Sequence, residues 1–176
     1  MTAQVPDTVL YKGEVYSIID LTGGIPACPE QFGMKPKIVE TTSYRGFYAT
    51  YELTQEALYL RSLKFSEKNN HYLPIQGVMP TIRDCQAIYK GLSVVVRFTG
   101  KLRLAKDFIE EFYIDMGFQI PVAFKTVLDV TLRDGEVVEI KDRSEEMEKK
   151  RKAFKRRESD NVFELIEEGF DLDSDS

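Results

Sequence analysis

The side chains with the most reactive chemistry in this 176-residue chain form no recognisable catalytic set. His71 is the only histidine, and it lies in the polar stretch Asn69-Asn70-His71-Tyr72 without a nucleophile motif beside it. A histidine often serves as a general base, but an isolated one in a polar loop is typical of a protein surface. The acidic residues Glu110, Glu111 and Asp115 are of the type that glycosidases use. That chemistry requires two carboxyl groups at a defined distance, which the sequence does not give, so this signal is weak. Because nucleophile-elbow, zinc-protease, Walker A and dinucleotide-binding motifs are all missing from the sequence, we predict no catalytic residues and no cofactor.

The cysteines and the N-terminal residues indicate a reducing compartment away from the membrane. Cys28 and Cys85 are too few for a disulfide framework, and we expect both thiols to be reduced, as in a cytosolic protein. No Cys-x-x-Cys pair or Cys/His cluster is present, so we predict no metal site. Residues 1–7 lack the basic and apolar regions of a signal peptide, and no apolar run approaches the roughly 20 residues that a membrane-spanning helix needs. We therefore expect a cytoplasmic protein without a membrane partner.

Arg45, Tyr48 and Glu52 form the best candidate for a ligand-binding site. Arg45 comes just before a strongly alternating stretch, residues 47–53, in which Tyr48 and Glu52 share the polar face. The planar guanidinium of an arginine can bind an anion through two parallel hydrogen bonds. If the three side chains line a pocket, the protein is an enzyme or a small-ligand carrier. The alternative is a turn followed by a solvated polar face.

Charge is distributed unevenly along the chain. The whole sequence has 24 basic and 29 acidic residues, for a net charge of −5. Residues 1–142 are close to neutral, with 16 basic and 18 acidic residues, whereas residues 143–157 have 8 basic and 3 acidic residues. Residues 158–176 have 8 acidic residues and no basic one. This division predicts a β-rich domain over 1–142 and a charged helical extension over 143–176 that ends in an acidic, disordered stretch.

The extension has the pattern of one helix followed by a second, shorter one. Ser144 can cap the first helix, in which three glutamates each precede a lysine by four residues, as Glu145 precedes Lys149. Only Met147 and Phe154 offer this helix an apolar stripe, so we expect it to be solvated. Residues 161–170 have the pattern of a second helix that is too short to be stable by itself. This second helix must dock on the body or on a partner, and the sequence leaves both open.

These features make the extension the candidate interaction surface. We predict that a protein partner, whose identity the sequence does not reveal, binds through residues 143–172. The candidate contact residues are Lys149, Lys152, Phe154, Arg156, Val162, Leu165 and Ile166. The basic helix could instead contact phosphates, but we do not expect a nucleic acid partner, because the acidic end would compete for the same cations.

The body has the two-residue periodicity of β-strands and almost no helical periodicity. Counted by strict alternation, Leu58 and Leu60 would lie on the face opposite to Leu63 and Phe65. Strands recur at short intervals and are joined by turn signals such as Asp134-Gly135. We therefore predict a mainly β fold, an antiparallel sandwich or open barrel with a C-terminal α-helical extension. The unpaired strand edges of such a sheet could pair in a homo-oligomer.

Three further expectations concern individual stretches of the body. In the strand at 101–104, alternation would turn Arg103 outward. After the Asp134-Gly135 turn, it would point Val138 and Ile140 inward. The stretch 107–120 has the apolar spacing of a short helical turn but is bounded closely by a glycine and a proline, so a turn and a loop both remain open.

Several short motifs of the body resemble a family of small uncharacterised bacterial β-rich proteins, over about residues 8–141. The motifs are Phe32-Gly33, Pro36, Tyr44-Arg45-Gly46-Phe47-Tyr48-Ala49-Thr50-Tyr51-Glu52-Leu53, Leu58-Tyr59-Leu60, Phe98-Thr99-Gly100-Lys101-Leu102-Arg103-Leu104, Met116-Gly117 and the final hairpin at Asp134-Gly135. The resemblance implies a β-rich fold. It implies no activity and no site residues, and the charged extension lies outside it.

The sequence supports three functional hypotheses of different classes. The first is a non-enzymatic binding or protein-interaction protein that uses the extension, because a complete core pattern comes without an assembled catalytic set. The second is an enzyme or small-ligand carrier with a pocket in the β domain near Arg45, Tyr48 and Glu52. The third and weakest is nucleic acid binding through the basic helix.

Overall fold

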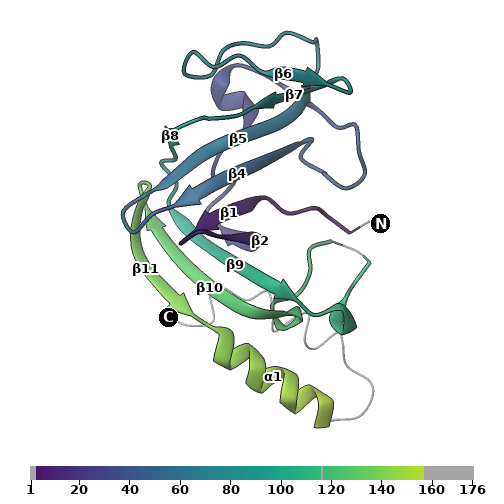
Figure 1. The fold of residues 1–176 in the computed structure, drawn as a ribbon, viewed down its shortest axis with the longest axis vertical. Coiled ribbons are helices and arrows are strands. Elements are labelled where there is room, and N and C mark those ends of the chain that lie inside the picture. The colour runs from purple at the N-terminus through teal and green to yellow at the C-terminus, as the bar shows by residue number, and fades with distance from the viewer. Residues whose placement is uncertain (1–2, 116, 157–176) are drawn as a thin grey trace.

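The computed structural model describes residues 3–115 and 117–156, with side chains described as far as residue 153. The described residues form strands, three 3-10 helices and one α-helix, in an elongated arrangement with β6 and β7 at one end and α1 at the other (Figure 1). The strands are β1 (Thr8–Tyr11), β2 (Glu14–Thr22), β3 (Pro36–Lys37), β4 (Phe47–Leu53), β5 (Leu58–Glu67), β6 (Thr81–Arg83), β7 (Gln86–Tyr89), β8 (Val94–Val95), β9 (Gly100–Phe108), β10 (Phe124–Arg133) and β11 (Glu136–Asp142). The helices are η1 (Pro29–Phe32), η2 (Glu110–Phe112), η3 (Pro121–Ala123) and α1 (Ser144–Arg156).

The strands form one sheet of 11 strands that does not close on itself. Its order is β11-β10-β9-β2-β1-β4-β5-β7-β6, and β3 and β8 pair separately with β5. Every strand pairing of the described chain is antiparallel except that of β1 with β4. An isolated bridge between Ala57 and Glu136 brings the start of β11 to the β4–β5 turn without closing the sheet. The prediction of a mainly β fold with a C-terminal helix is confirmed.

Two-residue turns connect the strands of the first hairpin, β1–β2, and of the last hairpin, β10–β11. Lys12 and Gly13 connect β1 to β2, and Asp134 and Gly135 connect β10 to β11, all four with positive φ. This conformation matches the twist of the flanking strands and favours glycine at the second position. At Gly135 glycine is also required by space, because an added Cβ would come within 2.5 Å of a backbone carbonyl oxygen.

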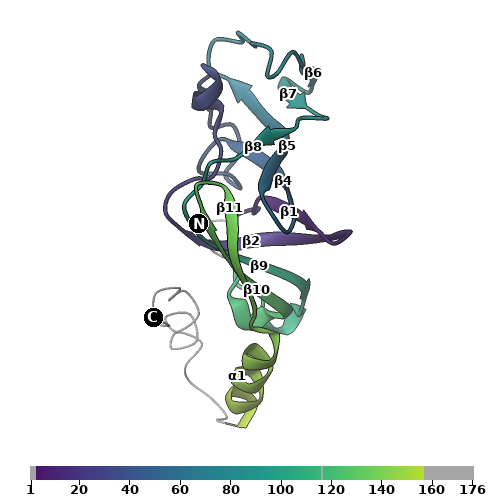
Figure 2. The same ribbon diagram turned by 90° about the vertical axis from the view of Figure 1, so that its left-hand side faces the viewer.

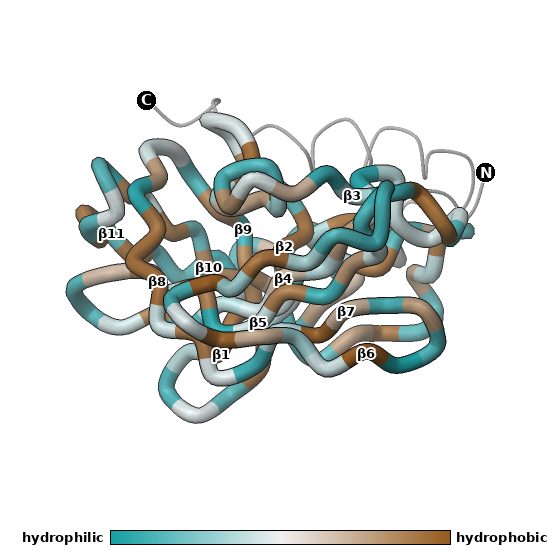
Figure 3. The backbone as a smooth tube through the Cα atoms, turned by 90° about the horizontal axis from the view of Figure 1, so that it is seen from above, coloured by the Kyte–Doolittle hydropathy of each residue, from teal (hydrophilic) through white to brown (hydrophobic). Residues whose placement is uncertain are grey.

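The large core lies on one face of the sheet and contains fully buried side chains from most of its strands, including Val9, Tyr51, Leu60, Leu104 and Val130. The two other views of the chain show the sheet twisting strongly between β5 and β10 (Figure 2), and hydrophilic stretches are frequent in the loops at its periphery (Figure 3). The loops between strands also bring apolar side chains over this face of the sheet. The buried loop residues are Ala27, Met34, Ile75, Leu92, Val96 and Phe98.

A second, smaller core lies on the opposite face, over β2, β9 and β10. Ile19, Ala105 and Val127 supply the sheet side, and Met147 of α1 packs on them with 1% of its surface exposed. The helix therefore covers the sheet at this end of the molecule (Figure 1). The expectation of a solvated helix holds for most of the described side chains of α1, which are exposed or half-buried, but Met147 is buried and seats one face of the helix on the sheet.

Candidate functional site

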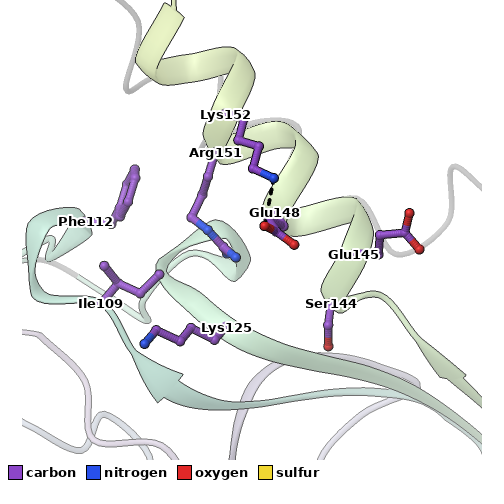
Figure 4. Close-up of a pocket in the computed structure, with 8 residues that line it drawn as sticks. All are labelled: Ile109, Phe112, Lys125, Ser144, Glu145, Glu148, Arg151 and Lys152. Atoms are coloured by element: carbon purple, nitrogen blue, oxygen red, sulfur yellow. Dashed lines mark ion pairs between the residues drawn. The ribbon is translucent and has the colours of Figure 1, made fainter.

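A groove lies between α1 and the end of the sheet. Its volume is about 540 Å³, and we call it the α1 groove (Figure 4). It is lined by Ile109, Phe112, Lys125, Ser144, Glu145, Glu148, Arg151 and Lys152. Five of these residues belong to the predicted extension, and the other three, between residues 109 and 125, come from η2, the preceding loop and β10. The groove therefore exists only because α1 lies against the sheet.

Ion pairs and hydrogen bonds hold the first turn of α1 to the sheet. Arg103 of β9 contacts the carboxylate of Asp129 through Nε at 2.7 Å and Nη2 at 2.8 Å. The same carboxylate accepts from Nε of Arg143 at 3.2 Å, and Arg143 also contacts Glu146 of the helix at 3.0 Å. Arg103 is buried, so the expectation that it points outward is wrong. It faces inward because α1 covers this side of β9, and Asp129 provides the counter-charge that a buried cation requires.

Arg151 holds the middle of α1 over the start of β10. Its Nη1 donates to the carbonyl oxygen of Val122 at 3.0 Å and to that of Phe124 at 2.7 Å. Burial lowers the pKa of Arg151 because the charged form loses solvent. In Figure 4 its side chain reaches from α1 across the groove toward the strand below. Arg151 is thus a clamp that positions the helix, and it divides the groove into a side near Phe112 and a side near Ser144.

The rim of the groove has charges of both signs. Lys152 pairs with Glu148 at 2.9 Å, and this hydrogen bond and charge lower the pKa of Glu148. Glu145 pairs with Lys149 at 3.0 Å, on a strongly exposed part of the helix. Lys125 of β10 is exposed and makes no ion pair within the described residues. Exposed pairs of this kind contribute little to stability, so they can exchange partners at low cost when another charged group enters the groove.

The floor of the groove is apolar and the groove has no catalytic pair. Ile109 and Phe112 are half-buried and face the groove from its sheet side (Figure 4). The single hydroxyl, that of Ser144, accepts a hydrogen bond from the backbone N–H of Val127 at 3.1 Å. His71 lies in the loop after β5, where its backbone N–H donates to Glu67 at 2.8 Å. An apolar floor with a charged rim suits the capture of an amphipathic segment.

The guanidinium of Arg45 pairs with a carboxylate of the same chain. Both of its terminal nitrogens contact the carboxylate of Asp7 at 2.8 Å, and the guanidinium stacks over the ring of Phe47 at 4.6 Å. Burial by itself would lower the pKa of Arg45, but the hydrogen bonds and charge of Asp7 outweigh it and the pKa is raised. Asp7 also accepts from the backbone N–H of Ala49 at 2.9 Å. This group fastens the chain before β1 to β4.

Tyr48 and Glu52 lie on the face of β4 turned away from the large core, and each has its own partner. The hydroxyl of Tyr48 donates to Glu40 at 2.9 Å, and Glu52 accepts from Nε of Arg61 at 2.6 Å. None of the three side chains of Arg45, Tyr48 and Glu52 lines the α1 groove. The ligand-binding role of the trio remains a prediction.

Of the predicted partner-binding residues, Lys149 and Lys152 are exposed on α1, and only Lys152 lines the groove. The side chains of Phe154 and Arg156 lie outside the described residues. So do Val162, Leu165 and Ile166, which belong to the second predicted helix. Sequence reasoning missed Ile109, Phe112 and Lys125 as site residues. The helical spacing around residue 109 was the one available signal, and it corresponds to η2.

Comparison with known proteins adds no family to this description. No family model, no curated protein and no solved structure matches the chain. The motif resemblance over residues 8–141 therefore contributes nothing to the function.

The two cysteines, Cys28 and Cys85, are not bonded to each other. Among the described residues there is no helix with the length and apolar character needed to cross a lipid bilayer.

Proposed function

We propose that this chain is a non-enzymatic protein-interaction protein of the bacterial cytoplasm, and that the α1 groove is its binding surface. The ligand would be a short amphipathic segment of a partner protein, with apolar side chains on Ile109 and Phe112 and charged side chains at the rim. The observation that carries this proposal is the preformed groove: α1 is held by Met147, Arg143 and Arg151 over an apolar floor.

The arrangement of the groove supports an interaction surface more than a catalytic centre. Apolar anchors enclosed by a polar rim are typical of the energetically important part of a protein interface. The hydroxyl of Ser144 and the half-buried guanidinium of Arg151 both have backbone partners. Lys125 and the ion pair of Lys152 with Glu148 remain at the rim for recognition.

The alternative functions have less support. A small ligand would fit the volume of the groove, which lies within the usual range for ligand pockets. A ligand site at Arg45 would require the guanidinium to leave Asp7. The buried carboxylate of Asp7 would then lose its counter-charge. A nucleic acid would have to displace the helix's own glutamates from Lys149, Lys150 and Lys152.

Affinity capture with one charge-reversed variant tests the proposal. Lys125→Glu reverses one charge at the rim of the α1 groove. Lys90→Glu is the matched control, because Lys90 is also exposed but lies between β7 and β8 and does not line the groove. Partners captured from a bacterial lysate by the full chain are identified by mass spectrometry, and binding of the purified partner is then measured. We expect Lys125→Glu to weaken the specific partner about tenfold, as the loss of an interfacial charge contact does. Equal binding by both variants and the unmodified chain would exclude the α1 groove as the surface.

A further inference from the structure

We propose that the segment 161–170 of this same chain folds back and docks in the α1 groove. The groove begins about one helical turn before the end of α1, because Arg151 and Lys152 line it and the helix ends at Arg156. The docked segment would compete with an outside partner, a consequence that rests on the function proposed above. The docking itself rests on the groove and on the composition of the segment.

The length of the chain beyond α1 matches the dimensions of the groove. Four residues, 157–160, can span up to roughly 14 Å, which is enough to reverse direction after Arg156, since antiparallel helices are commonly joined by two to five residues. Residues 161–170 as a helix would be about 15 Å long. The part of α1 that lines the groove, from Ser144 to Lys152, is about 12 Å long by the same rise per residue.

The segment has an apolar stripe that corresponds to the floor of the groove. Val162, Leu165 and Ile166 share one face at helical spacing. Ten residues are too few for a stable isolated helix in water, so the stripe needs a surface to cover it. Ile109 and Phe112 offer such a surface, since both are half-buried and face the groove.

The charges of the segment and the rim are complementary. Residues 158–176 contain 8 acidic residues and no basic one. At helical spacing Glu164, Glu167 and Glu168 all lie outside the apolar stripe, and Glu168 lies nearest to its edge, so a helix docked on this stripe would bring Glu168 closest to the rim. Lys125 is exposed there and has no ion pair within the described residues, whereas the rim glutamates Glu145 and Glu148 already pair with lysines of α1.

Zero-length cross-linking of the full chain tests this docking. A carbodiimide joins an amine to a carboxylate in direct contact, and Lys125 is nearly forty residues from Glu164 in the sequence. We expect a link between Lys125 and Glu164, Glu167 or Glu168 in the monomer. Peptide mass spectrometry on a mixture of ¹⁴N- and ¹⁵N-labelled chains shows whether each link lies within one chain or joins two.

Two tail variants make the test specific. Leu165→Asp with Ile166→Asp removes the apolar stripe, and we expect the yield of the Lys125 link to fall about tenfold because two buried aliphatic side chains are lost. Ser174→Asp with Ser176→Asp adds the same charge off the stripe and should retain the link. The proposal is overturned if the link is missing, if it persists equally in Leu165→Asp with Ile166→Asp, or if it forms only between two copies.

The same variants separate this inference from the proposed function. If the link is missing but Lys125→Glu still weakens the partner, the groove is an interaction surface that the tail does not cover. If the link is present and no partner responds to Lys125→Glu, the tail docks in the α1 groove and the proposed function is wrong. If both are right, Leu165→Asp with Ile166→Asp should raise the apparent affinity for the partner, since a larger fraction of the groove is open.

Discussion

The face of the sheet opposite the large core is polar in the half that contains β4 and β1 and apolar in the half that contains β9 and β10. Cross-strand neighbours on this face run from β4 to β10 as Thr50, Thr8, Ser17, Ala105 and Val127. The first three are polar and half-buried, and Thr50 contacts Thr8 through their hydroxyls at 3.2 Å. The last two belong to the second core, beneath α1. The row changes from polar to apolar where the helix begins to cover the sheet.

The burial patterns of the strands record the same change. In β4 buried and half-buried residues alternate along the whole strand, as expected where one face is covered and the other meets water. In β10 the four residues from Val127 to Val130 are all buried. A run of consecutive buried residues therefore marks the place where both faces of the sheet are covered. It also marks where a charged side chain must find a partner inside the protein.

Removing the buried carboxylate should have the largest effect. Asp129→Ala leaves Arg103 and Arg143 without their shared counter-charge, and we expect the free energy of unfolding to fall by about 3–5 kcal/mol. Urea denaturation followed by circular dichroism measures this change. The control is Glu52→Ala, which breaks an ion pair on the polar half of the same sheet and should cost less than about 1 kcal/mol. Equal losses in the two variants would contradict the difference between the halves.

Removing the apolar contact of α1 should have the next largest effect. Met147→Ala leaves a cavity over Ala105 and Val127, and we expect a loss of about 2–4 kcal/mol in the free energy of unfolding. Val15→Ala is the matched control, because Val15 is 63% exposed and its truncation should cost less than about 0.5 kcal/mol. If Met147→Ala unfolds at the same urea concentration as the unmodified chain, α1 does not contribute to the second core.

Alkaline pH should affect the large core first. Burial raises the pKa of Tyr51 and raises that of Tyr89 to about 12, whereas an unfolded tyrosine ionises near pH 10. The unfolded chain releases these protons at lower pH than the folded chain does. The free energy of unfolding is therefore unaffected by the two tyrosines below about pH 10, and above it decreases by up to about 1.4 kcal/mol per pH unit for each tyrosine. The second core, as described, contains no tyrosine.

Urea denaturation between pH 8 and 11 measures this slope. Tyr89→Phe removes one titrating hydroxyl and should make the dependence on pH less steep, although it also removes the hydrogen bond to the carbonyl oxygen of Leu73. The same slope in Tyr89→Phe and in the unmodified chain would mean that Tyr89 does not contribute to the alkaline loss.

Much of the sheet could be predicted from the sequence because alternation and turn residues act locally. The strand at 47–53 has the predicted bounds and faces. Two errors occur at β-bulges, each of which shifts the alternation by one residue. A bulge opposite Thr50 and Tyr51 places Leu58, Leu60, Leu63 and Phe65 together in the large core, although strict alternation separates the first two from the others.

A second bulge, between Thr131 and Leu132, has a similar effect on β11. Val137 packs against the large core and Val138 is 54% exposed, so the expectation that Val138 points inward is wrong. Ile140 does pack against the large core, as predicted. No residue type near these positions announces a bulge, because it arises from the fit between two strands rather than from either strand alone.

The candidate site was less accessible to sequence reasoning than the sheet. The charged helix and its glutamate–lysine pairs could be predicted, because residues four apart always meet on a helix. The floor of the groove could not, because Ile109, Phe112 and Lys125 become neighbours of α1 only when the helix packs on β10. Arg45 was expected to bind an anion through its guanidinium, but the sequence did not indicate the carboxylate that it contacts, because Asp7 is 38 residues away.

By itself, the amino-acid sequence determined the strands, the hairpin turns, the charged helix and the separation of charge between residues 143–157 and 158–176. These features depend on backbone preferences and on neighbours within a few residues. Only the tertiary structure decided that α1 covers β9 and β10, that Arg103 and Arg45 are used for internal ion pairs, and that an apolar groove opens beside Lys125. The physical reason is that burial is a property of the assembled molecule, and burial decides which polar groups must be paired and which surfaces remain for a partner.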